Sequence, residues 1–153
     1  MKRQKATDVF DKNIMDLIIP EDKVAFVQTI NPLEHALLVL VKSGYSAIPV
    51  LDTKYKLQGI ISKTMILNTI LGMERIEFEK LSEHKVAEVM KMEIAKIRPD
   101  ECFLSALKHS IDEPFLCVED EDGYFKGILP RSSMLKYLNH YLRDVSHEMS
   151  QPN

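Results

Sequence analysis

The sequence predicts an α+β fold made of two similar units, and three observations support this. The chain has 153 residues, 45% of them hydrophobic and 28% charged, which is the size and composition of a compact globular protein. Residues 48–64 recur as residues 116–132. Within each copy, strand-like apolar stretches alternate with stretches of helical period. We therefore expect the order β-α-β-β-α twice, each time as a three-stranded sheet covered by two helices, with the copies forming a pseudo-twofold pair.

The repeat keeps its register through both predicted hairpins. Val50-Leu51-Asp52 corresponds to Val118-Glu119-Asp120, and Gly59-Ile60-Ile61 corresponds to Gly127-Ile128-Leu129. Upstream, Ala36-Leu37 matches Ala106-Leu107 with a two-residue drift, which a loop absorbs easily. A pattern conserved over this length predicts a duplicated unit.

Each copy is predicted to contain the same elements in the same order. A short amphipathic segment opens it (residues 14–18 and 86–90), followed by an extended stretch (24–28 and 94–98). A helix begins after Pro32 or Pro99, because proline suits a first helical turn. Two strands joined by a tight polar turn come next, at 48–51 and 57–62 in the first copy. A second helix closes each copy, at 63–72 and from 132 to about 145, where Thr64 or Ser132 could be the N-cap.

These elements divide the chain into four parts. The first repeat spans residues 8–72 and the second spans residues 86–145. Between them, residues 73–85 are expected to be an ordered connector anchored by Ile76, Phe78 and Leu81. Residues 146–153 are expected to be a frayed tail.

Composition and missing motifs exclude several classes of function. The net charge of −3 and a pI near 6.0 argue against a nucleic-acid partner. The longest apolar run, residues 36–41, is too short to cross a membrane, and no signal peptide is expected. Cys102 and Cys117 stand apart and are expected to be core residues in a reduced, cytoplasmic protein. No metal-ligand spacing, nucleophile motif or phosphate-binding glycine loop occurs, so we expect no metal, no catalytic residue, no cofactor and no enzymatic activity.

The repeated Gly-Ile endings, each preceded by an aliphatic strand, resemble a tandem pair of cystathionine-β-synthase (CBS) domains, a Bateman module. Residues 21–25, 33–40, 44–52 and 74–81 further resemble the stand-alone CBS-pair receptors for cyclic di-AMP of Gram-positive bacteria, the CbpB/DarB type. That resemblance implies a homodimeric, non-enzymatic signal receptor. It also implies regulation of a protein target, the family's recurrent one being the bifunctional (p)ppGpp synthetase/hydrolase.

The resemblance also implies where the ligand binds. Arg131 would fork two N–H groups onto a phosphate, Lys23 would add a second positive charge, and Tyr45 would cover an adenine face. Small residues would let the base approach the backbone, whose polar groups can recognise the adenine edge. The expected ligand-binding residues are Lys23, Val24, Ala25, Tyr45, Ser46, Ala47, Ile48, Pro49, Arg131 and Ser132.

The duplicated cleft provides an internal comparison. At the positions equivalent to Lys23 and Tyr45, the other copy has Glu93 and Glu113, and Lys63 replaces Arg131. A dinucleotide with two phosphate charges should therefore prefer the first cleft.

Two alternatives remain open at this stage. One is a sensor of an adenine mononucleotide such as AMP or ATP. Mononucleotide-binding CBS copies usually hold the ribose with an aspartate six residues after the glycine, where this chain has Met65 and Ser133. The other is a dimerisation module without a ligand. A departure from the cyclic di-AMP type is Ser132, which stands where an arginine is frequent.

Overall fold

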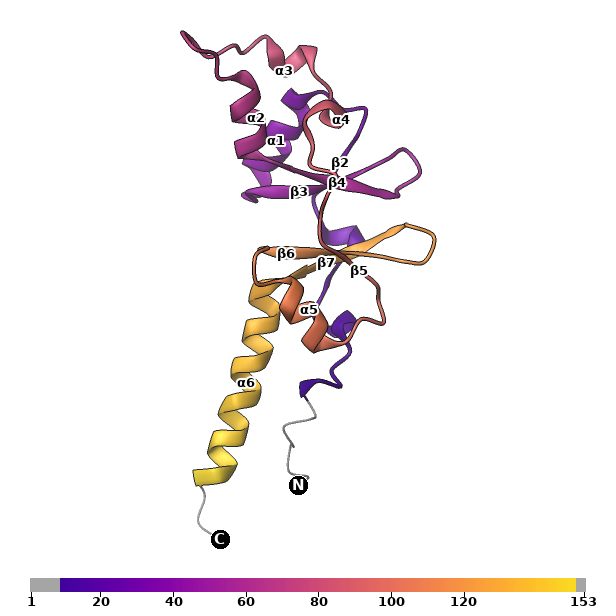
Figure 1. Ribbon diagram of the computed structural model, residues 1–153, viewed down its shortest axis with the longest axis vertical. Helices are drawn as coiled ribbons and strands as arrows, with labels where there is room; N and C mark the ends of the chain where they lie inside the picture. The colour runs from indigo at the N-terminus through magenta and orange to yellow at the C-terminus, as the bar shows by residue number, and fades with distance from the viewer. Residues whose placement is uncertain (1–8, 151–153) are drawn as a thin grey trace. The chain divides into compact units, whose positions relative to one another are not determined.

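The structure is a computed structural model that describes residues 9–150. These residues form two compact units, and each unit draws on separate parts of the sequence. The central unit contains residues 23–94 and 121–125, and the terminal unit contains residues 9–22, 95–120 and 126–150. Both units combine strands and helices, so the α+β prediction is confirmed (Figure 1).

The central unit is built around a three-stranded sheet in the order β2-β3-β4. β2 (Val27–Gln28) runs parallel to β3 (Ala47–Leu51), and β3 is antiparallel to β4 (Leu57–Ser62). Helices α1 (Leu33–Ser43) and α2 (Lys63–Ile70) cover one face of this sheet, as predicted (Figure 1).

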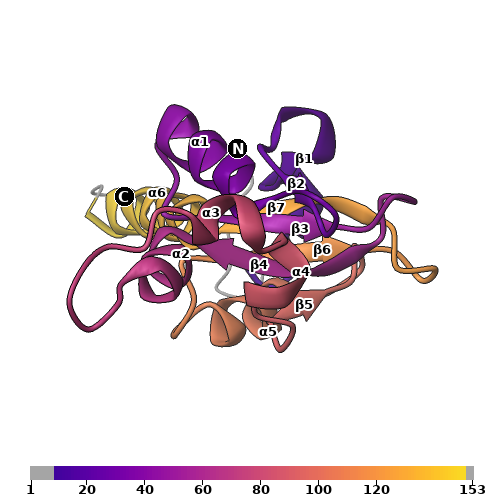
Figure 2. The ribbon, with the colours of Figure 1, turned by 90° about the horizontal axis from the view of Figure 1, so that it is seen from above.

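Two short helices complete the central unit. α3 (Lys80–Glu83) contacts both α1 and α2, and Figure 2 shows it next to them. α4 (Val86–Val89) follows and buries Val86 completely. The core between sheet and helices consists of aliphatic side chains: Val27, Leu33, Ala36, Leu40, Ile48, Val50, Ile61, Ile66 and Val86.

The terminal unit has a four-stranded sheet in the order β1-β7-β6-β5. β5 (Lys96–Ile97) is parallel to β6 (Phe115–Glu119), and β7 (Phe125–Pro130) pairs antiparallel with β1 (Ile19–Pro20). Three strands were predicted for this sheet, but it has four, because β1 pairs with β7 at the edge.

Three helical elements pack on this sheet. They are the 3₁₀ helix Ile14–Asp16, α5 (Phe103–His109) and α6 (Arg131–Ser150), while a second 3₁₀ helix (Glu21–Lys23) links β1 to the central unit. The core again consists mainly of apolar side chains: Val9, Ile14, Ile97, Phe103, Ala106, Leu116, Val118, Leu129, Met134 and Tyr141.

The segments that open the two copies are exchanged between the units. Ile19, from the opening of the first copy, pairs with Ile128 of the second. At the equivalent place in the central unit, Lys91 bridges Ile60, with N–H to carbonyl distances of 2.9 and 3.0 Å in the two directions. The repeats predicted at 8–72 and 86–145 are thus a different division of the chain from its compact units.

The ends of the helices differ from the predicted ones because of local capping and packing. The Ser62 hydroxyl, not that of Thr64, caps α2 by accepting from the Met65 N–H at 3.1 Å, and α2 ends at Ile70. α6 begins at Arg131 and continues to Ser150, past the end predicted near residue 145. Residues 151–153 lie outside the described residues.

Three residues predicted to be core or anchor positions are exposed: Ile76, Phe78 and Cys102. Leu81 packs against the central core as expected, but Phe78 keeps 64% of its surface exposed and Ile76 is also exposed. Cys117 is buried in β6, whereas Cys102 lies exposed just before α5.

Candidate functional site

The end of the central sheet where β3 begins carries the predicted ligand-binding residues Tyr45, Ser46 and Ala47. α1 ends at Gly44, which has φ +79° and donates its N–H to the Leu40 carbonyl at 3.0 Å. This left-handed residue suits glycine and redirects the chain into β3. Tyr45 and Ser46 follow as exposed residues. The Ser46 carbonyl accepts from the Lys63 N–H at 3.0 Å, and Ala47 pairs with Ser62, so the start of β3 lies against the start of α2.

The predicted residues from the preceding segment lie at the same end of the sheet. β2 and β3 are parallel in the register Val27 with Val50, so residues 24–25 precede β2 as residues 47–48 open β3. Val24 is buried and Ala25 half-buried, while Lys23 is exposed at the end of its 3₁₀ helix. The structure therefore brings this predicted group together within one unit.

Burial limits what some of these residues can offer a ligand. Ile48 is part of the central core, and Pro49 is buried within the middle strand of the sheet. Their side chains cannot reach solvent, so only backbone groups are available at these positions. Pro49 has no N–H and offers only its carbonyl. Exposed polar side chains come from Lys23, Tyr45 and Ser46.

The remaining two predicted residues, Arg131 and Ser132, lie in the terminal unit at the start of α6. The Arg131 N–H donates to the Pro114 carbonyl at 2.9 Å, which repeats the bond between Lys63 and Ser46 in the other copy. Ser132 is exposed and Arg131 is half-buried. The ten predicted residues are thus divided between the units, at repeat-equivalent ends of the two sheets.

The Arg131 side chain has partners that sequence analysis did not anticipate. Its Nη1 donates to the Ile111 carbonyl at 3.0 Å and to the Ser110 carbonyl at 3.3 Å. Both acceptors lie at the C-terminal end of α5, where a cation is favourable because carbonyl groups are left without helical partners. Arg131 therefore links the start of α6 to the end of α5.

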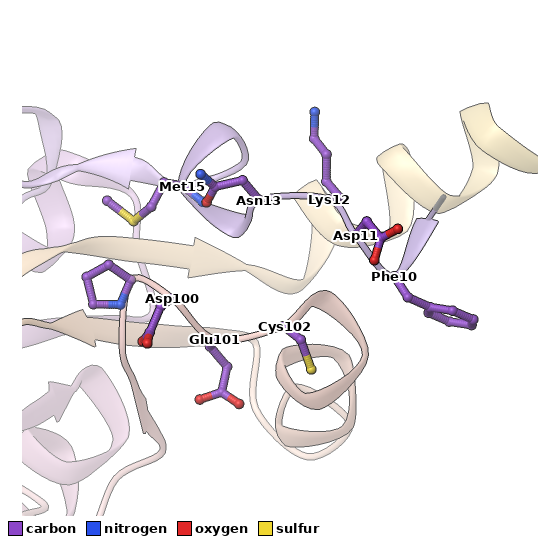
Figure 3. A pocket seen from close by; sticks show the side chains of 9 residues that line it. Phe10, Asp11, Lys12, Asn13, Met15, Asp100, Glu101 and Cys102 are labelled. Atoms are coloured by element: carbon purple, nitrogen blue, oxygen red, sulfur yellow. The ribbon is translucent and has the colours of Figure 1, made fainter. Parts of the chain in front are cut away.

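A pocket of about 480 Å³ in the terminal unit was not predicted (Figure 3). It lies between the N-terminal segment around Asn13 and the loop before α5, which an isolated bridge joins at Asn13 and Cys102. Figure 3 shows Asp100 and Glu101 extending from this loop and Phe10 pointing away. None of the ten predicted residues lines it, and its walls come together only through long-range pairing, which leaves no local sequence signal.

The described residues provide no clustered metal ligands, and their buried cysteine is a poor nucleophile. Residues 9–150 contain no group of three or more His, Cys, Asp or Glu side chains placed to hold a metal ion. Burial raises the pKa of the Cys117 thiol to about 12, so its reactive thiolate form is scarce at neutral pH. No helix within this range is both long and apolar enough to span a membrane.

Comparisons with known proteins add evidence that geometry alone does not supply. A CBS domain model matches residues 14–72. The chain is 43% identical over 142 residues to cyclic di-AMP receptor B of Bacillus subtilis, covering 93% of this chain and 97% of that protein.

Solved structures agree in fold over most of the chain. A CBS domain-containing protein from Bacillus anthracis is 56% identical with a TM-score of 0.84, covering 89% of this chain and 99% of that one. The CbpB protein of Listeria monocytogenes, crystallised in complex with c-di-AMP, is 46% identical with a TM-score of 0.80, covering 86% and 98%.

Proposed function

Since this chain belongs to the CBS-domain family that includes cyclic di-AMP receptor B, we propose that it is itself a non-enzymatic receptor for cyclic di-AMP. The observation that carries the proposal is the 43% identity to that receptor over nearly the full length of both chains. The complex of the similar Listeria CbpB with c-di-AMP supports it. The receptor regulates a protein target according to ligand occupancy, by favouring one state of its surface over another.

The ligand lies against the residues expected from the sequence. The exposed ends of Lys23 and Arg131 supply positive charge to its phosphates, and Ser46 donates a hydroxyl. Tyr45, 39% exposed at the start of β3, covers an adenine face. The buried side chains of Val24, Ile48 and Pro49 leave their backbone groups for the base edge.

The charges favour ligand binding at Lys23 and Arg131 over binding at the equivalent residues of the other repeat. Lys23 and Arg131 together carry two positive charges, whereas the equivalent positions hold Glu93 and Lys63, with Glu113 in place of Tyr45. Two negative charges repel a doubly anionic ligand. We therefore expect one strong site per chain.

Exposed apolar helix faces support the proposal of a homodimer. Leu38 and Val41 on α1 are more than half exposed, and Leu67 on α2 is nearly so. Exposed aliphatic side chains in such groups mark surfaces that another protein covers. The proposed target is the (p)ppGpp synthetase/hydrolase, and the proposed location is the cytoplasm. No cofactor is required.

The proposal is tested by calorimetry with cyclic di-AMP, cyclic di-GMP, AMP and ATP side by side. We expect cyclic di-AMP to bind most tightly, at one ligand per chain. Arg131→Met should weaken it at least about tenfold, because a charge-assisted hydrogen bond is lost. Lys136→Met, which removes a positive charge elsewhere on α6, is the matched control.

Several outcomes would contradict the proposal. Tighter binding of AMP or ATP would favour the mononucleotide sensor. Melting temperatures unchanged by any ligand would favour a ligand-free dimerisation module, because a ligand that binds the native state stabilises it. Unchanged affinity in Arg131→Met would show that Arg131 does not contact a phosphate. Two strong sites per chain would show that the two repeat-equivalent sets bind the ligand equally well.

A further inference from the structure

The end of α5 is organised around a buried polar residue, Ser110, which is only 1% exposed. Its hydroxyl donates to the Leu107 carbonyl at 2.7 Å, and its N–H donates to the Ala106 carbonyl at 3.1 Å. These bonds fix the last turn of the helix and the direction of the carbonyls that follow. The carbonyls of Ser110 and Ile111 are the two groups that accept from Arg131.

The first copy ends its equivalent helix with similar bonds, since the Ser43 hydroxyl donates to the Leu40 carbonyl at 3.3 Å, but the group that follows differs. Gly44 closes α1 with a backbone bond to Leu40, and the residue equivalent to Arg131 is Lys63. A lysine ammonium is a single point charge, whereas a guanidinium presents five N–H groups in a rigid plane. Among residues 9–150, the second copy alone has an arginine at this position, and it donates to carbonyls at the end of the preceding helix.

We propose that Ser110 is a positioning residue for the ligand: the end of α5 holds Nη1 of Arg131 and thereby presents the opposite edge of the guanidinium to a phosphate. This inference rests on the proposed function. Nη1 is occupied by two carbonyls, and within residues 9–150 no hydrogen bond is found for Nε or Nη2. Those two nitrogens form the side-on fork that matches two phosphate oxygens.

Holding Arg131 in this way changes its contribution to the free energy of ligand binding. A free arginine loses rotamer freedom when it binds, whereas one already held by the protein has lost part of it before the ligand arrives. The tether also prevents Nη1 from competing for the phosphate. Arg131 is thus oriented in the unliganded protein, and ligand binding requires no change at the end of α5.

The first test separates orientation from charge. Arg131→Lys keeps the positive charge but cannot hold two carbonyls and fork a phosphate together. We expect cyclic di-AMP affinity to fall at least about tenfold, close to the effect of Arg131→Met. Affinity within threefold of the wild type would show that charge alone suffices and would overturn the inference.

The second test acts through Ser110 without touching the arginine. Ser110→Ala removes the hydroxyl bond that fixes the end of α5 and should weaken cyclic di-AMP binding about three- to tenfold. Ser82→Ala is the matched control, because the Ser82 hydroxyl makes the same kind of bond, to the Glu79 carbonyl at 3.1 Å, in α3, which binds Arg75 through the Glu79 carboxylate and not through backbone carbonyls. Equal affinities in both variants would count against the inference.

A measurement on the wild type keeps the proposal falsifiable if Ser110→Ala does not fold. In the ligand-free protein labelled with ¹⁵N-arginine, the Nη1 and Nη2 resonances of Arg131 should be separate, because rotation is blocked. A single averaged resonance would overturn the tether. If the wild type binds no cyclic di-AMP, the proposed function fails and the inference with it, whereas wild-type binding with an unaffected Arg131→Lys variant overturns the inference alone.

Discussion

Gly127 lies where the carbonyl of Ile19 passes closest to β7. A Cβ atom at this position would overlap that carbonyl oxygen, and the backbone φ of +147° is one that side chains rarely adopt. Gly59 has the same relation to the Lys91 carbonyl in the central unit. The glycine of each repeated Gly-Ile pair is therefore what lets the exchanged segment pair with the sheet.

Gly127→Ala should lower the free energy of unfolding by about 2–4 kcal/mol, because it adds both backbone strain and overlap with a neighbouring strand. Gly44→Ala is the control, since Gly44 has a positive φ but nothing within 4 Å of the added methyl group. It should cost only about 1 kcal/mol. Urea denaturation measures both, and equal losses would mean that β1 does not pack this closely.

The two cysteines should differ sharply toward a thiol reagent. Burial raises the pKa of Cys117 to about 12, while Cys102 is exposed. Because the thiolate is the reactive form, we expect one fast-reacting thiol per chain at pH 8 and a second only after denaturation. Cys102→Ser should abolish the fast phase. Two fast thiols in the native protein would contradict the burial of β6.

Among the elements, the hairpins were the most predictable. β4 matches the predicted range 57–62, and β3 begins one residue earlier than expected. Alternating apolar residues and a polar turn are local signals, so a hairpin can be read from a short window. Helix ends depend on which neighbouring group caps them and on what the last turns pack against. In α6, Tyr141 is buried and Val145 packs on the core, which continues the helix beyond the predicted end.

The exposure of some candidate-site residues also follows from local signals. Tyr45 and Ser46 are exposed where the repeat pattern places them, because they follow a helix end and open a strand. The contact between Arg131 and the end of α5 was not predictable. It joins residues about twenty positions apart through backbone carbonyls, and carbonyls carry no residue-specific signal in a sequence.

The Ser62 cap at the start of α2 leads to a prediction about stability. Ser62→Ala removes the acceptor for the Met65 N–H and should cost about 1 kcal/mol of stability. Thr64→Ala, two residues away and exposed, should change stability by less than about 0.5 kcal/mol. Thermal unfolding followed by circular dichroism compares the two. A larger effect at Thr64 would mean that Thr64 is the N-cap and that α2 starts two residues later than described.

At the scale of the whole molecule, sequence repeats and compact units divide the chain differently. The amphipathic pattern of residues 14–18 predicts burial, but it does not say which of two equally apolar sheets they cover. Ile14 lies in the core of the terminal unit, and its repeat equivalent Val86 lies in the core of the central unit. The choice is made by long-range pairing of β1 with β7, which no local window contains.

Ile14→Ala should therefore destabilise the terminal unit, although Ile14 belongs to the first copy in sequence. The side chain is completely buried, so the expected loss is about 2–5 kcal/mol. Hydrogen exchange should accelerate in β6 and β7 more than in β3 and β4. Ile30→Ala, at an exposed position, is the control. Faster exchange confined to the central unit would contradict the observed packing.

The exchange of opening segments also bears on how the protein is made. As the nascent chain leaves the ribosome, Ile19 emerges long before its pairing partner Ile128, and Ile14 emerges long before Leu129 of the same core. The terminal unit can therefore close only after β7 has been made. Until then the segment from Ile14 to Ile19 has no strand to pair with, and its apolar side chains are accessible to a chaperone.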